Sequence, residues 1–166
     1  GPLNDLKEII DLNTNSASEV IAFGDNNNQM AIAHILQVYM YHHMTDRWGA
    51  IPYSQALKGA DNISPALDQQ QDVYTGLFAQ LEAAMGYINS SSVQVQGDIM
   101  FGGDMNSWRR FANTLKMTMA LRISDVDPST AQSKFTEAVN GGVLSSTSQN
   151  VHYPYLTADA HDNPWQ

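Results

Sequence analysis

The apolar positions of this chain recur with the period of an α-helix over five stretches, and no stretch alternates convincingly as a β-strand would. The clearest stretch runs from Asp104 to Arg122. Its main face carries apolar side chains at i, i+3, i+4, i+7 and i+11, namely Trp108, Phe111, Ala112, Leu115 and Met119. A second apolar face, formed by Met117, Ala120 and Leu121, predicts that this helix packs on two sides with Trp108 in the core. Asp104 or Asn106 is expected to cap its first turn.

Four further helices are predicted, over residues 3–13, 27–47, 68–88 and 128–140. The second is expected to end at Gly49, because glycine readily adopts the left-handed conformation that terminates helices, and Pro52 prevents the helix from resuming. The third is expected to open with Asp68 and Gln71 as a reciprocal capping pair. The last is expected to start with Asp127 as its cap and to bury four apolar side chains, Ala131, Phe135, Ala138 and Val139.

These helices form two consecutive pairs, the second with the third and the fourth with the fifth. The loop at 49–65 joins the helices of the first pair, and the loop at 89–103 joins the two pairs. We therefore predict an all-α fold of tetratricopeptide-like stacked helix pairs with long connecting loops. The spacing is irregular, and the consensus of a regular array is absent. From Val143 onward the helical period ends, and the chain is expected to be extended or loop.

The composition narrows the possible functions. The chain has 166 residues, of which 43 % are hydrophobic, so it can form a core as one domain or as a piece of a larger one. Its formal net charge is −9, which excludes nucleic-acid binding and docking on anionic lipid, because both require a basic surface. It has no cysteine and no apolar run long enough to cross a membrane. Gly1-Pro2 is interpreted as the scar of an expression tag, which leaves residues 3–166 as the helical-repeat portion.

The sequence offers no convincing catalytic or metal site. His42 and Asp46 lie four apart on one helix face, but zinc needs three or four protein ligands, so a structural role is favoured. The segment 25–28 resembles part of a calcium loop, yet Met30 and Leu36 stand where such a loop needs Gly and Glu, and a helix cap is favoured instead. No nucleotide-binding or nucleophile motif is present. We expect no catalytic residue, no metal and no cofactor, and therefore no enzyme.

Three aromatic residues lie in predicted loops, and an arginine lies near a helix face. Trp48, Tyr53 and Trp165 could present flat surfaces to sugar rings or peptides, or could anchor their loops to the helical core. Both interpretations stay open, and Trp48 and Tyr53 are the candidate ligand-binding residues. Arg122 is expected to bury its stem and to pair with an acid, with anion binding as the alternative.

Four segments of the chain resemble the SusD/RagB family. Residues 39–53 end in Arg-Trp-Gly-Ala-Ile-Pro-Tyr, and residues 65–88 carry a Val-Tyr pair before Gln-Leu-Glu-Ala-Ala. Residues 98–123 carry Gly-Gly-Asp followed by Trp-x-x-Phe-Ala-Asn, and residues 138–144 fit together with the closing Asn-Pro-Trp. The resemblance covers most of residues 20–166. Ala50, where the family often has Asp, and Lys116-Met117 depart from its pattern.

The resemblance implies a nutrient-binding component, for glycan or peptide, of a TonB-dependent outer-membrane uptake system that acts with a SusC-like transporter. It also implies a non-enzymatic, surface-exposed lipoprotein of the cell outer membrane, held there only by a lipid anchor that this chain lacks. The natural chain is expected to continue beyond residue 166, so residues 1–166 alone are expected to bind oligosaccharide weakly or not at all. The alternative is a helical-repeat module that binds only proteins. The sequence does not identify the ligand.

Overall fold

The computed structural model describes residues 1–151 as a set of helices. Six are α-helices, namely α1 (Pro2–Asn15), α2 (Ala17–Val20), α3 (Asn26–Trp48), α4 (Gln70–Tyr87), α5 (Met105–Arg122) and α6 (Pro128–Asn140). Three are short 3-10 turns, namely η1 (Ile21–Phe23), η2 (Gly59–Asp61) and η3 (Thr147–Gln149). The β pairing within these residues is one isolated bridge between Ile51 and Asp68. The all-α prediction is confirmed, and Trp165 lies outside the described residues.

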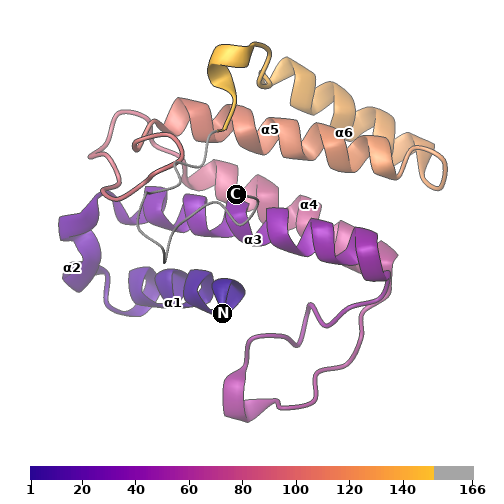
Figure 1. The fold of residues 1–166 in the computed structure, drawn as a ribbon, viewed down its shortest axis with the longest axis horizontal. Coiled ribbons are helices and arrows are strands. Elements are labelled where there is room, and N and C mark those ends of the chain that lie inside the picture. The colour runs from indigo at the N-terminus through magenta and orange to yellow at the C-terminus, as the bar shows by residue number, and fades with distance from the viewer. Residues whose placement is uncertain (152–166) are drawn as a thin grey trace, which may run out of the picture.

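The helices stack in antiparallel pairs around α3. Figure 1 shows α3 and α4 side by side with opposite directions, α1 along another side of α3, and the α5–α6 pair above them. Helix α3 contacts α1, α4 and α5, whereas α6 packs on α5. The two predicted pairs are therefore α3–α4 and α5–α6, arranged as in a tetratricopeptide-like stack. No helix in the described part of the chain is both long and apolar enough to cross a bilayer.

Aspartates cap three of the helices, as the sequence predicts. The Asp25 carboxylate accepts from the Asn28 amide, Asp104 accepts from the Asn106 amide, and Asp127 accepts from the Thr130 amide. Each carboxylate satisfies an amide that has no partner within its own helix, and its charge complements the helix dipole. Asp25 is thus a cap in the loop that resembles a calcium site. At the other end of α3, Gly49 follows the last helical residue with φ of 73°.

Trp108 of α5 lies at the centre of the core, with 1 % of its surface exposed. Its ring meets Phe101 and Phe111 edge-to-face, at centroid distances of 5.1 and 5.9 Å. Its indole nitrogen donates to the Asp98 carboxylate at 2.7 Å. Asp98 also accepts from the backbone amides of Met100, Phe101 and Gly103, so one carboxylate fixes the loop before α5 and orients the central tryptophan.

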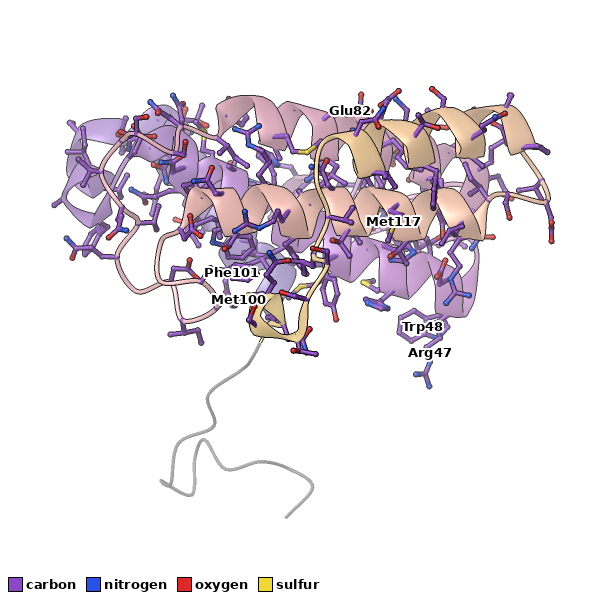
Figure 2. The ribbon with its side chains drawn as sticks, turned by 90° about the horizontal axis from the view of Figure 1, so that it is seen from above. Arg47, Trp48, Glu82, Met100, Phe101 and Met117 are labelled. Carbon is purple, nitrogen blue, oxygen red and sulfur yellow. The ribbon has the colours of Figure 1, made fainter. Side chains whose placement is uncertain are left out.

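Buried polar side chains join helices that are distant in sequence. Asn28, which is fully buried, donates to the Asn89 carbonyl at 2.9 Å and accepts from the Asn89 amide at 2.8 Å. The Lys116 side chain is 6 % exposed, and its ammonium lies 3.6 Å from carboxylate oxygens of both Glu82 and Glu137. Figure 2 labels Glu82 on α4, beside the α5–α6 pair. These contacts fasten α3 to the end of α4, and α5 to both α4 and α6.

Some residues of α5 and α6 differ from their predicted burial. Ala131 and Ala138 are buried as expected, but Phe135 is 36 % and Val139 45 % exposed. On α5, Ala120 is buried whereas Leu121 is 57 % exposed. The predicted burial of Phe135 and Val139 is wrong, because α6 meets α5 through its small alanines and its other face is uncovered within the described residues. Leu121, which the sequence places on the second apolar face of α5, does not share the burial of Ala120.

Candidate ligand-binding site

Trp48 presents an aromatic surface to solvent at the end of α3. Its side chain is 63 % exposed, because Gly49 ends the helix immediately after it. The Arg47 guanidinium lies 5.6 Å from the centroid of the Trp48 ring, a cation–π distance that restrains the indole. Figure 2 shows Arg47 and Trp48 projecting together from one end of the molecule, away from the helices. Trp48 therefore offers an aromatic surface that no core contact covers.

Tyr53 follows five residues later and is held against the helices. Its ring meets Tyr41 edge-to-face at 5.0 Å, and its hydroxyl donates to the Gln80 side-chain oxygen at 3.1 Å. A Cβ on residue 76 would collide with the Tyr53 ring, so the ring can pack at this position only because residue 76 is glycine. Burial is the main cause that raises the pKa of Tyr53 to about 12. These contacts are those of a loop anchor, the alternative that the sequence leaves open for Tyr53.

Asp68 closes the base of the loop that carries Tyr53. Its carboxylate accepts from the backbone amides of Tyr53 and Ser54 and from the Ser54 hydroxyl, at 2.7 to 3.0 Å. The hydrogen bonds from Ser54 lower the pKa of Asp68. The predicted capping pair of Asp68 and Gln71 is therefore wrong: α4 begins at Gln70 behind Gln69, without a side-chain cap. The Asp68 carboxylate binds across the loop instead of capping the helix.

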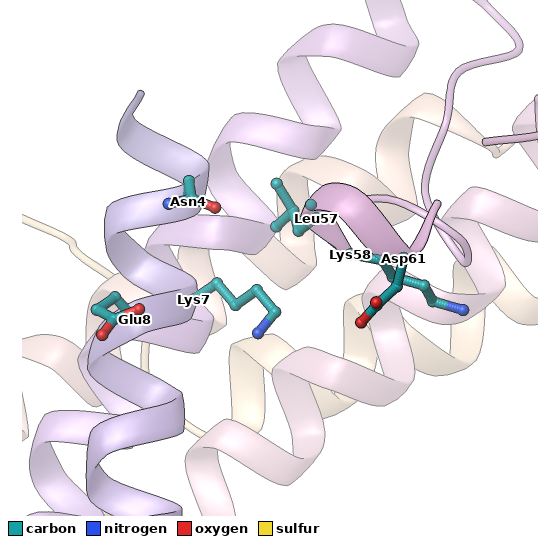
Figure 3. A pocket seen from close by; sticks show the side chains of 7 residues that line it. Asn4, Lys7, Glu8, Leu57, Lys58 and Asp61 are labelled. Atoms are coloured by element: carbon teal, nitrogen blue, oxygen red, sulfur yellow. The ribbon is translucent and has the colours of Figure 1, made fainter. Parts of the chain in front are cut away.

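Two adjoining hollows lie between α1 and this loop. The first is polar, has a volume of about 390 Å³, and is lined by Asn4, Lys7, Glu8, Leu57, Lys58, Gly59 and Asp61. Figure 3 shows Lys7 extending from α1 toward the segment that carries Leu57 and Asp61. The second is an apolar groove of about 550 Å³, lined by Gly1, Pro2 and Leu3 at the start of the chain and by Tyr39, Met40, His43 and Met44 of α3. Asn4 and Leu57 line both hollows, so the two adjoin.

A partly buried polar cluster joins α3, α4 and α5 near Trp48. The Asp46 carboxylate accepts from the Tyr74 hydroxyl at 2.5 Å, and it lies 3.2 Å from both the Arg122 guanidinium and the His42 ring. Arg122 pairs with an acid as expected, but it is 65 % exposed, so its predicted burial is wrong. His42 is 2 % exposed. No group of three or more metal-ligating side chains occurs in the described residues. The contacts of Asp46 with Tyr74 and Arg122 connect α3 to α4 and α5.

Acidification should destabilise the fold, because burial lowers the pKa values of His34 and His42. Unfolded histidine, with its ordinary pKa of 6.5, then binds more protons than the folded protein as the pH falls. This contribution to stability is present above that value and is lost as the pH falls toward the folded-state pKa values. We expect a lower Tm at about pH 5.5 than at about pH 7.5. The carboxylates whose pKa values are lowered remain ionised over this whole interval.

The double variant His34→Gln/His42→Gln is the control for this prediction, and its Tm should depend less on pH over the same interval. Asp46 and His43 face His42 from its own helix, Tyr74 faces it from α4 and Arg122 from α5. Asp46 favours the charged imidazole and opposes the burial effect. A Tm that rises on acidification would show that the attraction to Asp46 outweighs burial, and would contradict the prediction.

The comparisons with known proteins agree on one family. A family model described as starch-binding associating with the outer membrane, of SusD-like type, matches residues 1–166. A comparison with curated proteins gives no significant match. Among solved structures, a chitin-binding protein is 32 % identical with a TM-score of 0.77, covering 90 % of this chain and 30 % of its own.

Two further solved structures show the same relation. A SusD homologue from Bacteroides uniformis is 26 % identical with a TM-score of 0.76, covering 94 % of this chain and 31 % of its own. A chitin-binding SusD homologue from Flavobacterium johnsoniae is 33 % identical with a TM-score of 0.68, covering 75 % of this chain and 27 % of its own. This chain thus spans about 30 % of the length of the structures that it resembles. Because the family model matches the whole chain and its helices superpose on SusD homologues, the chain belongs to the SusD-like family.

Proposed function

We propose that this chain is part of a glycan-binding component of an outer-membrane nutrient-uptake system, and that it binds its ligand without altering it. Membership of a starch-binding family and two chitin-binding neighbours support a glycan as the ligand. The observation that carries the proposal within this chain is the exposed indole of Trp48 on a rigid helical scaffold. A peptide ligand is the other class that the resemblance allows.

The proposed ligand contact is apolar stacking. A sugar ring has a face of C–H groups that can lie against an indole, and burying that face removes apolar surface from water. Arg47 restrains the Trp48 ring before the ligand arrives, so less rotational freedom is lost on binding. Tyr53 contributes by holding the loop that follows Trp48 against α4, through Gln80 and the space left by Gly76.

The proposal also includes the cellular location and the partner of the natural protein. We place the natural protein at the cell outer membrane as a surface-exposed lipoprotein, with a SusC-like TonB-dependent transporter as its partner. The family description, which associates its members with the outer membrane, supports this location. Co-purification of such a transporter with the full-length protein from outer membranes tests the partnership.

Replacing Trp48 with Ala in the full-length protein should weaken glycan binding by about 5- to 30-fold, because a stacked aromatic contact contributes about 1–2 kcal/mol. Isothermal titration with chitin and starch oligosaccharides measures the effect. Tyr53→Ala is the matched comparison and should lower the Tm, because it removes a packed ring and its hydrogen bond to Gln80. If the two replacements together left affinity unchanged and only lowered the Tm, both aromatics would be anchors and the stacking proposal would fail.

The alternative function is a helical-repeat module that binds only proteins. The partly exposed Phe135 and Val139 on α6 favour it, because these two apolar side chains are left uncovered within the described residues. The same preparation from outer membranes distinguishes the two functions. A recovered transporter together with glycan binding supports the first function, whereas a recovered polypeptide without affinity for any saccharide supports the second.

A further inference from the structure

We propose that the two adjoining hollows between α1 and the 57–61 segment form a second saccharide subsite, specific for neutral sugars and separate from Trp48. This inference rests on the proposed function, since it assigns part of the same ligand to another place on the chain. The polar hollow measures about 390 Å³ and the apolar groove about 550 Å³. Both lie within the range of roughly 300–1,000 Å³ that is typical of small-ligand sites.

The chemistry of the two hollows matches the two sides of a sugar ring. The groove offers Tyr39, Met40 and Met44, which suit the apolar C–H face of a ring. The polar hollow offers an amide on Asn4, carboxylates on Glu8 and Asp61, and ammonium groups on Lys7 and Lys58. A carboxylate accepts from neighbouring hydroxyls and an ammonium donates to them, so vicinal hydroxyls find both kinds of partner.

Several charged groups of the polar hollow have no partner among the described residues. Within residues 1–151, Glu8, Lys58 and Asp61 make no ion pair and no side-chain hydrogen bond, although charges of both signs line the same hollow. Lys7 pairs with Asp11 on its own helix. The side chains of Glu8, Lys58 and Asp61 are exposed, and a ligand hydroxyl can replace the water bound to each of them with a charged hydrogen bond.

The charge balance decides the class of saccharide. The lining contains two ammonium groups and two carboxylates, so the hollow is formally neutral, while the chain as a whole carries −9. Only four lysines occur in the whole sequence, and two of them line this hollow. A uronic-acid glycan would gain no net attraction here and would be repelled by the rest of the surface. The site is therefore built for an uncharged saccharide.

The backbone conformation of Leu57 also supports the assignment of a ligand site to these hollows. It is the one residue other than glycine with positive φ among the described residues, at 60°, and it lines both hollows. A branched aliphatic residue rarely adopts the left-handed conformation, and such strain concentrates at ligand sites. The conformation places an apolar side chain where the polar and apolar hollows meet.

The test is isothermal titration of the full-length protein with chitin and starch oligosaccharides. Asp61→Ala on the loop and Lys7→Gln on α1, on opposite walls of the hollow, should each weaken binding of the neutral saccharide about tenfold at unchanged Tm. Asp72→Ala is the control, because it removes the same charge from an exposed position on α4, outside both hollows. Oligogalacturonate, an anionic probe, should not bind.

The possible outcomes separate this inference from the proposed function. If the wild-type protein binds a saccharide and neither Asp61→Ala nor Lys7→Gln changes its affinity, the subsite is overturned while the proposed function stands. Tighter binding of oligogalacturonate than of the neutral probes would also overturn it. If the full-length protein binds no saccharide, the proposed function fails and the subsite fails with it.

Discussion

Replacing Trp108 with Ala lowers the free energy of unfolding by about 4 kcal/mol, which is the typical cost of removing a large aromatic side chain from a core. Trp108 is 1 % exposed, and it packs against Phe101 and Phe111. The variant also leaves the Asp98 carboxylate without its indole donor. In a chain of this size the loss corresponds to a Tm decrease of roughly 10 °C. Denaturant and thermal unfolding measure both quantities.

Trp48→Ala is the matched control for this prediction, because it removes the same side chain from a position that is 63 % exposed. Its effect on unfolding should stay within about 0.5 kcal/mol. Trp108→Phe should fall between the two, since it keeps an aromatic ring in the core but loses the hydrogen bond to Asp98. Equal destabilisation by the two alanine variants would contradict the assignment of Trp108 to the core and Trp48 to the surface.

Replacing Asn28 with Ala lowers the free energy of unfolding by about 3 kcal/mol. Asn28 is fully buried at the start of α3 and exchanges two hydrogen bonds with the backbone of Asn89, just beyond the end of α4. The variant removes both bonds and leaves an amide and a carbonyl of Asn89 without these partners. Each lost hydrogen bond costs about 1 kcal/mol, and the space left by the fully buried side chain adds to this loss, which makes it the second-largest expected effect.

Asn27→Ala is the control for Asn28, because Asn27 is the exposed neighbour in the same turn of helix. It should change the free energy of unfolding by no more than about 0.5 kcal/mol. Asn28→Asp should be as damaging as Asn28→Ala, since it keeps the acceptor but loses the donor and buries a charge. If urea unfolding of Asn27→Ala and Asn28→Ala gave the same midpoint, the bridge to Asn89 would contribute nothing to stability.

The long helices could be predicted from the sequence because their apolar side chains repeat with one period. Asp25, Asp104 and Asp127 marked three helix starts, since an aspartate before a helix has a local role that spacing reveals. The four residues of α2 were not predicted, because a helix of one turn carries no period. The buried polar residues Asn28 and Lys116 also carry no hydrophobic signal, and their partners lie far away in sequence.

Two errors in the prediction have the same physical origin. Asp68 has the spacing of a capping residue, yet its carboxylate accepts from Tyr53 and Ser54 across the loop. Phe135 has the spacing of a buried face, yet the alanines of α6 make the contact with α5. In each case the tertiary partner decides the outcome, and local spacing cannot identify that partner.

The candidate site was only partly visible in the sequence. Trp48 and Tyr53 could be singled out as loop aromatics. Tyr53 is the more buried of the two because Gly76 and Gln80 of α4 hold its ring, and the sequence does not show that these residues lie beside it. The hollows could not be predicted at all. They depend on Lys7 of α1 lying opposite Asp61, more than fifty residues later in the chain.

Equilibrium binding of chitin and starch oligosaccharides to the full-length protein, followed by length analysis of the recovered ligand, tests the central claim most directly. The account predicts saturable binding of a neutral oligosaccharide, weakened by Trp48→Ala, and recovery of the ligand at its original length. Absence of binding to every saccharide, or recovery of shortened products, would contradict it.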